Sequence, residues 1–226
     1  TKAGLTVNKV IADGFPFSLT IGIYASLVVV FAGILFGSVC ALRQNKLIDR
    51  FFMVLSTLGS TIPSFVLATG FLFLFSKTLG LVPAFGVDEV AGYIGPVLVI
   101  GAFPLSFITR LTRTSLVEVQ QQDYIRTARS KGISEFKVIY KHALRNALLP
   151  VVTYIGPMVA SIVTGSFVIE TVFGIPGVGQ LFTDSIVNRD YPLIMGITVF
   201  FAVLLVLAVL IVDLVYVLID PRIKLD

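Results

Sequence analysis

The residues best suited to do chemistry in this sequence lie in one basic segment, residues 110–146. It contains eight lysine and arginine residues, and Arg126, Arg129 and Lys131 fall within the short stretch 123–132. Guanidinium and ammonium groups form charge-assisted hydrogen bonds with carboxylates, so the expected chemistry is recognition of an acidic protein surface. The alternative interpretation is that these charges only fix the orientation of a membrane protein.

The same segment has the pattern of two short helices. Asp123 can cap the first helix, and Gly132 is a natural left-handed stop. Ser134 can begin a second helix, with Glu135 near its positive end. In that second helix the apolar residues share one face and the basic residues lie four apart on another: Phe136, Ile139, Tyr140, Ala143, Leu144 and Ala147 against Lys137, Lys141 and Arg145. A signal for orientation alone needs neither helix, so the pattern favours docking of another protein.

Catalysis and metal binding have little support in this sequence. Cys40 is the one cysteine and His142 the one histidine, which excludes an internal disulfide and a site of several histidines. No nucleophile, base and orienting group converge in the pattern. The chain also lacks the G-x-x-x-x-G-K-[ST] phosphate loop, so we expect other chains to bind ATP.

Asp213 is the one ionisable residue inside an apolar span. A carboxylate in that position suggests an intramembrane polar site for a proton or a substrate. It lies near the end of its span, however, where Arg222 or neighbouring hydroxyls can pair with it. We favour the structural pairing, and substitution by asparagine separates the two roles.

Composition places the chain in a membrane. Of its 226 residues, 56% are hydrophobic and only 13% are charged, with a mean hydropathy of +0.98, whereas a soluble domain carries about 25% charge. Five apolar windows approach the roughly 20 residues that a spanning helix needs. They cover about 17–42, 51–76, 93–109, 147–169 and 191–219, after a lead-in segment at 1–15. The sequence therefore predicts an all-α, polytopic membrane helical bundle with about five spans.

The basic residues also predict an orientation. Residues 43–50, 110–146 and 222–224 hold 13 of the 17 lysine and arginine residues. Because basic residues near span ends stay on the cytoplasmic side, these three stretches are expected inside the cell. The first residues are then outside, the lead-in segment is on the outer side, and the carboxyl terminus is cytoplasmic.

Several motifs resemble those of bacterial dipeptide, oligopeptide and nickel ABC importer permeases. The sequence Tyr-Ile-Arg-Thr-Ala-Arg-Ser-Lys-Gly at 124–132 and His-Ala-Leu-Arg-Asn-Ala-Leu-Leu-Pro at 142–150 are similar to the cytoplasmic signature of that family. The stretches at 169–180, 188–192 and 220–222 resemble its first-permease branch. Residues 126–128 read Arg-Thr-Ala where the broader signature has Glu-Ala-Ala, a variation that peptide-type permeases share. The family has a further span and an outer domain before the matched region, so we expect a trimmed permease.

The resemblance implies a fold, a set of partners and a contact site. It implies a type I ABC importer transmembrane domain over 16–226, with a cytoplasmic coupling segment at 110–146. The implied partners are a second homologous permease, two cytoplasmic ATPase subunits that bind ATP, an extracytoplasmic peptide-binding protein and membrane lipid, without nucleic acid. No cofactor is expected in this chain. The residues implied to contact the ATPase are Tyr124, Arg126, Thr127, Ala128, Arg129, Lys131 and Gly132.

The function predicted from these observations is import of peptides across a bacterial inner membrane by a transporter subunit that is not an enzyme. The nearest alternative is a permease for nickel or another small solute, because those importers share the architecture. A secondary transporter is a second alternative, but it predicts buried carboxylates or inverted repeats, which Asp213 alone supports poorly. A scaffold protein would leave the two cytoplasmic helices without a purpose.

Overall fold

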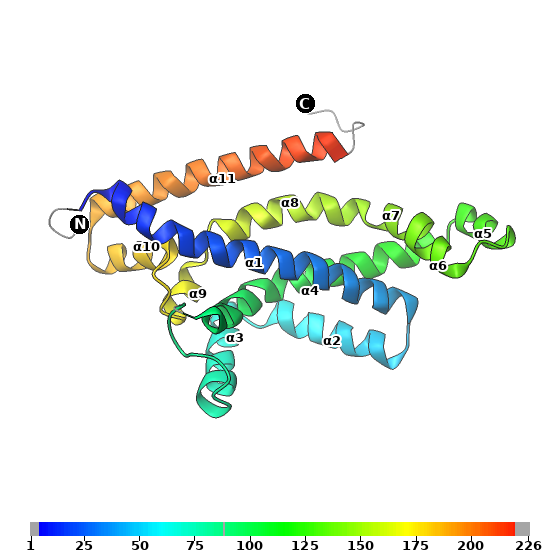
Figure 1. Ribbon diagram of the computed structural model, residues 1–226, viewed down its shortest axis with the longest axis horizontal. Helices are drawn as coiled ribbons and strands as arrows, with labels where there is room; N and C mark the ends of the chain where they lie inside the picture. The colour runs from blue at the N-terminus through cyan, green and yellow to red at the C-terminus, as the bar shows by residue number, and fades with distance from the viewer. Residues whose placement is uncertain (1–4, 88, 220–226) are drawn as a thin grey trace. The chain divides into compact units, whose positions relative to one another are not determined.

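The structure is a computed structural model that describes residues 5–87 and 89–219, and within them every regular element is a helix (Figure 1). In chain order the elements are α1 (Val7–Leu42), α2 (Leu47–Thr61), α3 (Ser64–Phe71), the π-helix η1 (Leu72–Thr78), the 3₁₀-helix η2 (Val90–Tyr93), α4 (Ile94–Gln120), α5 (Asp123–Ser130), α6 (Glu135–Lys137), the π-helix η3 (Val138–Ala143), α7 (Leu144–Ala147), α8 (Leu149–Val163), α9 (Phe167–Val172), α10 (Val178–Val187) and α11 (Tyr191–Ile219). The all-α prediction is confirmed.

Three of these helical stretches are long and apolar enough to cross a membrane: Val7–Leu42, Val90–Gln120 and Tyr191–Val212. Two further pairs of helices qualify if each is taken as one broken span, which makes up to five within the described residues. Each of the five expected windows overlaps one of these stretches, but the fourth, expected to reach residue 169, ends at Val163, because the chain leaves the helix at Gly165 with φ +91° before α9 begins. The first begins earlier than expected, because residues 7–15 of the lead-in segment are already helical.

The second expected span is not continuous. Its two helices, Leu47–Thr61 and Ser64–Thr78, are separated by a break at Ile62 and Pro63. Proline has no N–H to donate and pushes the residue before it out of the helical region. Pro63 itself is extended, with φ −57° and ψ 142°, and α3 begins one residue later.

The third expected span continues well beyond its predicted end at residue 109. The α4 helix runs through Pro104 without interruption and ends at Gln120, so the first eleven residues of the segment 110–146 belong to it. Basic side chains such as Arg110 and Arg113 therefore lie on a continuous helix. The sequence alone placed them in a loop because charge interrupts the apolar window.

The chain divides into two compact units. The first unit contains residues 1–27, 62–101 and 156–226, and the second contains residues 28–61 and 102–155. In the first unit, Ile11, Val178, Leu193 and Ile197 form a buried apolar cluster that joins α10 to the first turns of α1 and α11. Aromatic rings surround it, and Phe15 meets Phe200 edge to face at 5.2 Å between ring centroids.

The second unit contains the C-terminal parts of α1 and α4, together with α2 and α5 to α7. The α1 and α4 helices approach closely there, because a Cβ atom at Gly37 would lie 2.6 Å from the Thr109 carbonyl oxygen. One buried cluster, which we call the hinge cluster, joins α1 and α4 to the short helices that follow. It consists of Ala41, Leu116, Ile125, Ala128, Val138, Ala143 and Ala147.

Candidate functional site

The α5 helix divides into a buried face and an exposed face. Ile125 and Ala128, three residues apart, are buried in the hinge cluster. Arg126 and Thr127 lie on the exposed face, and the Thr127 hydroxyl donates to the Asp123 carbonyl oxygen at 2.9 Å. The helix is therefore anchored by two small apolar contacts and offers its polar side outward.

The start of α5 differs by one residue from the prediction. Gln122 takes the N-cap position with an extended backbone, and Asp123 is the first helical residue, without a capping hydrogen bond. Its carboxylate still lies in the first turn, where it complements the positive end of the helix. It also approaches Arg126 at 3.7 Å, but both side chains are so exposed that this pair contributes little.

The predicted left-handed stop at Gly132 is confirmed. Gly132 has φ +72°, and its N–H donates to the Arg129 carbonyl oxygen at 2.9 Å. The N–H of Ile133 reaches back to the Ala128 carbonyl oxygen at 3.4 Å. These two bonds form the pattern that satisfies the last carbonyls of a helix when the next residue is left-handed. Ile133 then packs against the hinge cluster, which fixes the chain direction after the turn.

Arg129 and Glu135 join the two sides of this turn. The guanidinium donates to Glu135 through Nη2 at 2.6 Å and through Nε at 3.1 Å. These hydrogen bonds raise the pKa of Arg129 above its usual value, so the group stays charged. We expected Arg129 to bind carboxylates of another chain, but in the structure it is paired with Glu135 of this chain.

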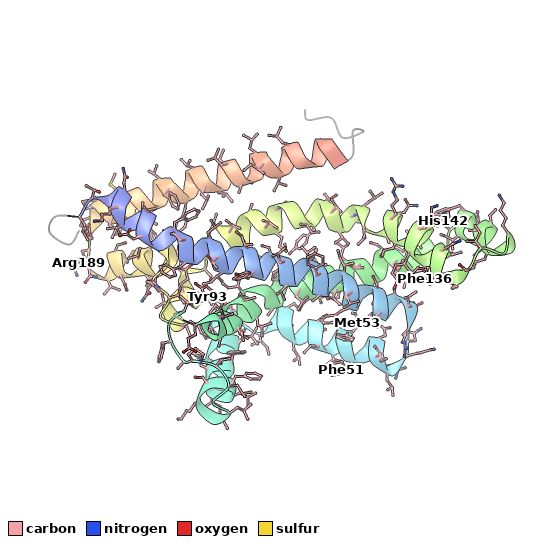
Figure 2. All side chains as sticks on the ribbon, in the orientation of Figure 1. Phe51, Met53, Tyr93, Phe136, His142 and Arg189 are labelled. Atoms are coloured by element: carbon pink, nitrogen blue, oxygen red, sulfur yellow. The ribbon has the colours of Figure 1, made fainter. Side chains whose placement is uncertain are left out.

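The second short helix presents a different face from the one predicted. Phe136 and Tyr140, expected among the packed residues, are 68% and 54% exposed, while Val138 is buried. Val138 and Ala143, five residues apart, share the buried side of the π-helix η3, whose wider turns depart from the spacing of an α-helix and leave Tyr140 off the packed face, while Phe136 lies before η3. The rings of Phe136 and Tyr140 lie 4.3 Å apart, and Phe136 stands near the end of the second unit that carries α5 (Figure 2).

One side-chain hydrogen bond ties α5 to α7. The amide nitrogen of Asn146 donates to the Tyr124 hydroxyl at 2.8 Å. After α7 the chain bends by 51° between residues 147 and 149 and continues as α8. The helices from α5 to α7, with the turn between α5 and α6, therefore form one folded hairpin, residues 123–147, which we call the coupling hairpin.

The predicted contact residues lie together in the structure, but they differ in exposure to solvent. Tyr124, Arg126, Thr127, Arg129, Lys131 and Gly132 are exposed, whereas Ala128 is buried in the hinge cluster. Ala128 therefore packs inside this chain. Asp213 lies in α11, but its side chain is outside the described residues, so its role stays a prediction.

Sequence reasoning missed a second polar centre, around Glu170 in the first unit. Glu170 is 1% exposed, and its Oε2 accepts the N–H groups of Gly179 at 2.7 Å and of Gln180 at 3.2 Å. The hydroxyl of Ser18 accepts the N–H of Val178 at 2.9 Å. Side chains from α9 and α1 thus satisfy the first three amides of α10, which a helix cannot satisfy itself.

Glycine is required where the chain passes this carboxylate. A Cβ atom at Gly177 would collide with Glu170 Oε2 and would lie 2.6 Å from Ser18 Oγ, and one at Gly179 would lie 2.8 Å from Oε2. Burial raises the pKa of Glu170, and the hydrogen bonds from Ser18, Gln180, Gly179 and Ser166 oppose that rise. The glycines at 177 and 179 therefore let the backbone pass close around a buried carboxylate.

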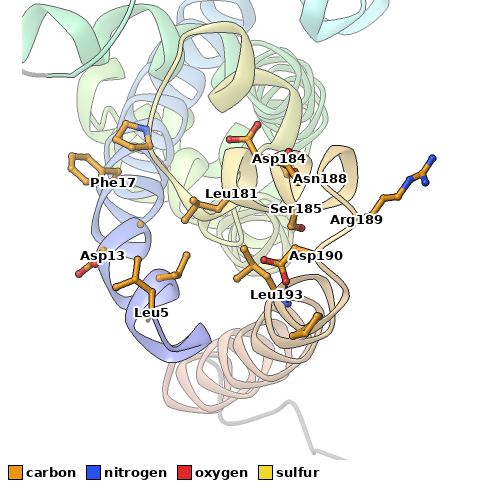
Figure 3. Close-up of a pocket in the computed structure, with 14 residues that line it drawn as sticks. Leu5, Asp13, Phe17, Leu181, Asp184, Ser185, Asn188, Arg189, Asp190 and Leu193 are labelled. Carbon is orange, nitrogen blue, oxygen red and sulfur yellow. Dashed lines mark hydrogen bonds between the residues drawn. The ribbon is translucent and has the colours of Figure 1, made fainter. Parts of the chain in front are cut away.

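A cavity of about 980 Å³ lies beside this centre in the first unit (Figure 3). Pro176 and Leu181, which flank the Glu170-bound amides, line it together with Phe17 of α1. Its polar lining comes from Asp13, Asp184, Ser185, Asn188, Arg189 and Asp190. Among the described residues, no group of three histidine, cysteine, aspartate or glutamate side chains could hold a metal ion.

The arrangement of helices matches the fold of solved chains from ABC transporters. A chain of the MetNI methionine ABC transporter in an inward-facing conformation has the same fold, with a TM-score of 0.74 over 92% of this chain and 94% of that chain at 16% identity. A structure of an amino acid ABC transporter with histidines matches with a TM-score of 0.70 over 92% of each chain, again at 16% identity.

The chain belongs to the family described as binding-protein-dependent transport system inner membrane component, whose model matches residues 33–225. It is 50% identical to the dipeptide transport system permease protein DppB of Bacillus subtilis, over 99% of this chain and 73% of that protein. It is 43% identical to the oligopeptide transport system permease protein OppB of Haemophilus influenzae, over 97% of this chain and 72% of that protein. The family predicted from the motifs is confirmed.

Proposed function

We propose that this chain is the permease subunit of an ATP-driven importer for peptides, and that the coupling hairpin receives the motion of an ATPase subunit. The observation that carries the proposal is the geometry of α5, a short basic helix anchored by Ile125 and Ala128 with its polar face turned outward. The names of the relatives, dipeptide and oligopeptide permeases, support peptides as the substrate class over nickel.

The exposed face of α5 fits a carboxylate-bearing partner. Arg126 is 71% exposed, and Lys131 is exposed at the turn. Arginine forms paired hydrogen bonds with carboxylates, which fix orientation as well as supplying energy. The exposed rings of Phe136 and Tyr140 add apolar surface on the same hairpin. We assign this surface to one of two ATPase–permease contacts, and a second homologous permease provides the other.

The hairpin has the connections that a lever needs. Ile125 and Ala128 of α5 share the hinge cluster with Leu116 of α4 and Ala147 of α7. Interiors are close-packed, so a displaced helix carries its packed neighbours with it. A displacement of α5 therefore moves α4, which it contacts directly, and it moves α8 through α7. Residues 124 and 146 stay together during that movement because of their hydrogen bond.

Orientation follows from the basic residues. With residues 110–146 in the cytoplasm, the alternation of apolar windows and basic stretches along the sequence favours an outer location for residues 170–190, where we expect contact with the extracytoplasmic peptide-binding protein. The carboxyl terminus is then cytoplasmic, in agreement with the distribution of lysine and arginine. The importer takes its energy from ATP hydrolysis in the partner subunits.

The test is uptake by the complete importer in proteoliposomes, with ATP supplied on the ATPase side. A labelled dipeptide, a labelled pentapeptide and Ni²⁺ are offered with the binding protein. We expect ATP-dependent accumulation of at least one peptide and none of Ni²⁺. Accumulation of Ni²⁺ alone, or uptake driven by a proton gradient without ATP, would refute the proposal.

A pair of variants tests the coupling contact in the same preparation. Arg126→Glu with Lys131→Glu reverses the charge of the exposed face, and we expect it to weaken binding of the ATPase subunit. Arg43→Glu is the control, because Arg43 is an exposed basic residue outside the coupling hairpin. If both preparations bind the ATPase equally, the exposed face of α5 is not the contact.

A further inference from the structure

The second unit contains an ion pair that the coupling contact does not use. Arg113 of α4 donates to Asp49 of α2 through Nε at 2.6 Å and through a second nitrogen, Nη2, at 2.7 Å. The two residues are 64 positions apart in sequence. The Asp49 side chain is 3% exposed and the Arg113 side chain 22%. The ion pair is therefore bidentate, and its carboxylate is almost completely shielded from solvent.

A third donor holds the carboxylate in place. The backbone N–H of Asn45 donates to Asp49 Oδ2 at 2.8 Å, and Asn45 has φ +65°. Asn45 belongs to the tight turn between α1 and α2. The Asp49 carboxylate thus connects three pieces of the unit: the turn after α1, the first turn of α2, and α4.

Stability alone does not account for such a pair. A buried carboxylate and a partly buried guanidinium lose hydration, and apolar side chains of similar volume often stabilise such a contact as well or better. The paired hydrogen bonds of a guanidinium and a carboxylate instead fix the relative position of the two groups. The contact therefore sets the register of α2 along α4.

The position of the pair connects α2 to the coupling hairpin. Arg113 lies seven residues before the end of α4 at Gln120, which is about 10 Å along the helix. Leu116, one turn further on, belongs to the hinge cluster with Ile125 and Ala128 of α5. The described members of that cluster come from α1, α4, α5, η3 and α7, and none comes from α2.

The α2 helix depends on lateral contacts for its position. The break at Ile62 and Pro63 disconnects it from α3. At its far end Gly59 packs against α4, where a Cβ atom would lie 3.1 Å from the Ala102 carbonyl oxygen. At the end near the coupling hairpin, Asp49 and Arg113 supply the directional contact.

We propose that Asp49 and Arg113 are positioning residues of the transport cycle, which attach α2 to α4 so that α2 moves together with the coupling hairpin. The proposal rests on the proposed function, in which the hairpin receives the motion of the ATPase. It assigns α2 to the moving part of the permease. If α2 were not attached to α4, the ATPase would hydrolyse ATP without completing the conformational change that transports the substrate.

The first measurement is the distance between α2 and the coupling hairpin in the complete importer. Spin labels are placed on cysteines at Val54 of α2 and Arg145 of α7, both exposed in the second unit and outside the residues assigned to the ATPase contact, while the native Cys40 is buried. We expect one narrow distance distribution that stays the same with and without ATP. With Arg113→Lys or Asp49→Asn we expect a broad distribution that shifts with ATP. A distance that already changes with ATP in the intact protein would overturn the proposal.

The second measurement is the number of dipeptide molecules transported per ATP hydrolysed, which loss of folded protein alone does not change. We expect Arg113→Lys and Asp49→Asn to lower this ratio about tenfold, within the usual range for coupling between sites. Matched controls make the same chemical changes at exposed positions, Arg50→Lys on α2 and Glu118→Gln on α4. An unchanged ratio in the first two variants would contradict the proposal.

A double variant separates position from stability. Asp49→Leu with Arg113→Met keeps an apolar contact and is expected to retain thermal stability. We expect its transport ratio to stay low because the directional bond is lost, and full recovery of the ratio would overturn the proposal. Failure of the proposed function is recognised separately, because the ATPase subunit would then not bind even to the intact coupling hairpin.

Discussion

Arg129 and Glu135 form an ion pair across the turn at Gly132, with a guanidinium nitrogen 2.6 Å from a carboxylate oxygen. The contact closes the turn between α5 and α6. The hydrogen bond between Tyr124 and Asn146 closes the other end of the hairpin. With Ile125 and Ala128 buried beneath α5, the segment is a folded unit that can be displaced as a whole.

The first prediction concerns Arg129. Because the two side chains are 39% and 56% exposed, Arg129→Ala is expected to cost less than about 1 kcal/mol of stability. Arg129→Glu is expected to reduce ATP-driven uptake more, since it places two carboxylates across the turn. The exchange Arg129→Glu with Glu135→Arg restores the pair, so uptake should recover. Recovery of thermal stability without uptake would show that Arg129 contacts the ATPase directly.

The second prediction concerns Gly132. Its φ of +72° is unfavourable for a β-branched residue, and Gly132→Val is expected to cost about 1–2 kcal/mol or to open the turn. Binding of the ATPase subunit and uptake per ATP should both fall. Gly132→Asn is the matched control, because asparagine tolerates the left-handed region. Normal transport by the valine variant would count strongly against a lever built on this turn.

The third prediction is a pH dependence from Glu170. Its pKa is raised in the folded protein by burial, so the folded state favours the protonated carboxyl. The stability that this group contributes is therefore complete below its unfolded pKa and is lost as the pH rises through the raised value. Thermal unfolding in detergent, followed by circular dichroism, should show this loss in the native protein and not in Glu170→Gln. An identical pH profile for the two proteins would refute the assignment.

The fourth prediction compares two glycines. Gly177→Ala places a methyl group against Glu170 and within 2.6 Å of Ser18 Oγ, so the start of α10 must shift. We expect a loss of about 1–3 kcal/mol, typical of overpacking. Gly70→Ala in α3 is the control, because no described atom lies within 4 Å of the added Cβ. Comparable melting temperatures for the two variants would contradict the packing around Glu170.

Local signals in the sequence were enough for part of this architecture. The apolar windows located the spanning segments, and Gly132 marked the end of α5, because a left-handed residue after a helix has a strong preference for glycine. The basic residues of α5 were also correctly placed on a short helix. Each of these features depends on residues close together in the chain.

Features that depend on distant residues could not be found in this way. Glu170 is paired with the α10 amides through a turn, and Ser18, which completes the site, is 160 positions from Val178. Asp49 and Arg113 looked like ordinary charges at the ends of apolar windows. The exposure of Tyr140 goes with the π-helix η3 in which it lies, and a periodicity of 3.6 residues does not reveal such a change.

The most direct test of the account is cross-linking from the exposed face of α5 in the complete importer. Thr127→Cys introduces an exposed thiol into a chain whose own cysteine is buried, and Asn188→Cys is a matched exposed position after α10. With a short thiol-reactive photo-cross-linker, we expect attachment to the ATPase subunit from position 127 and none from position 188. An actively hydrolysing importer in which position 127 never reaches the ATPase would contradict the account.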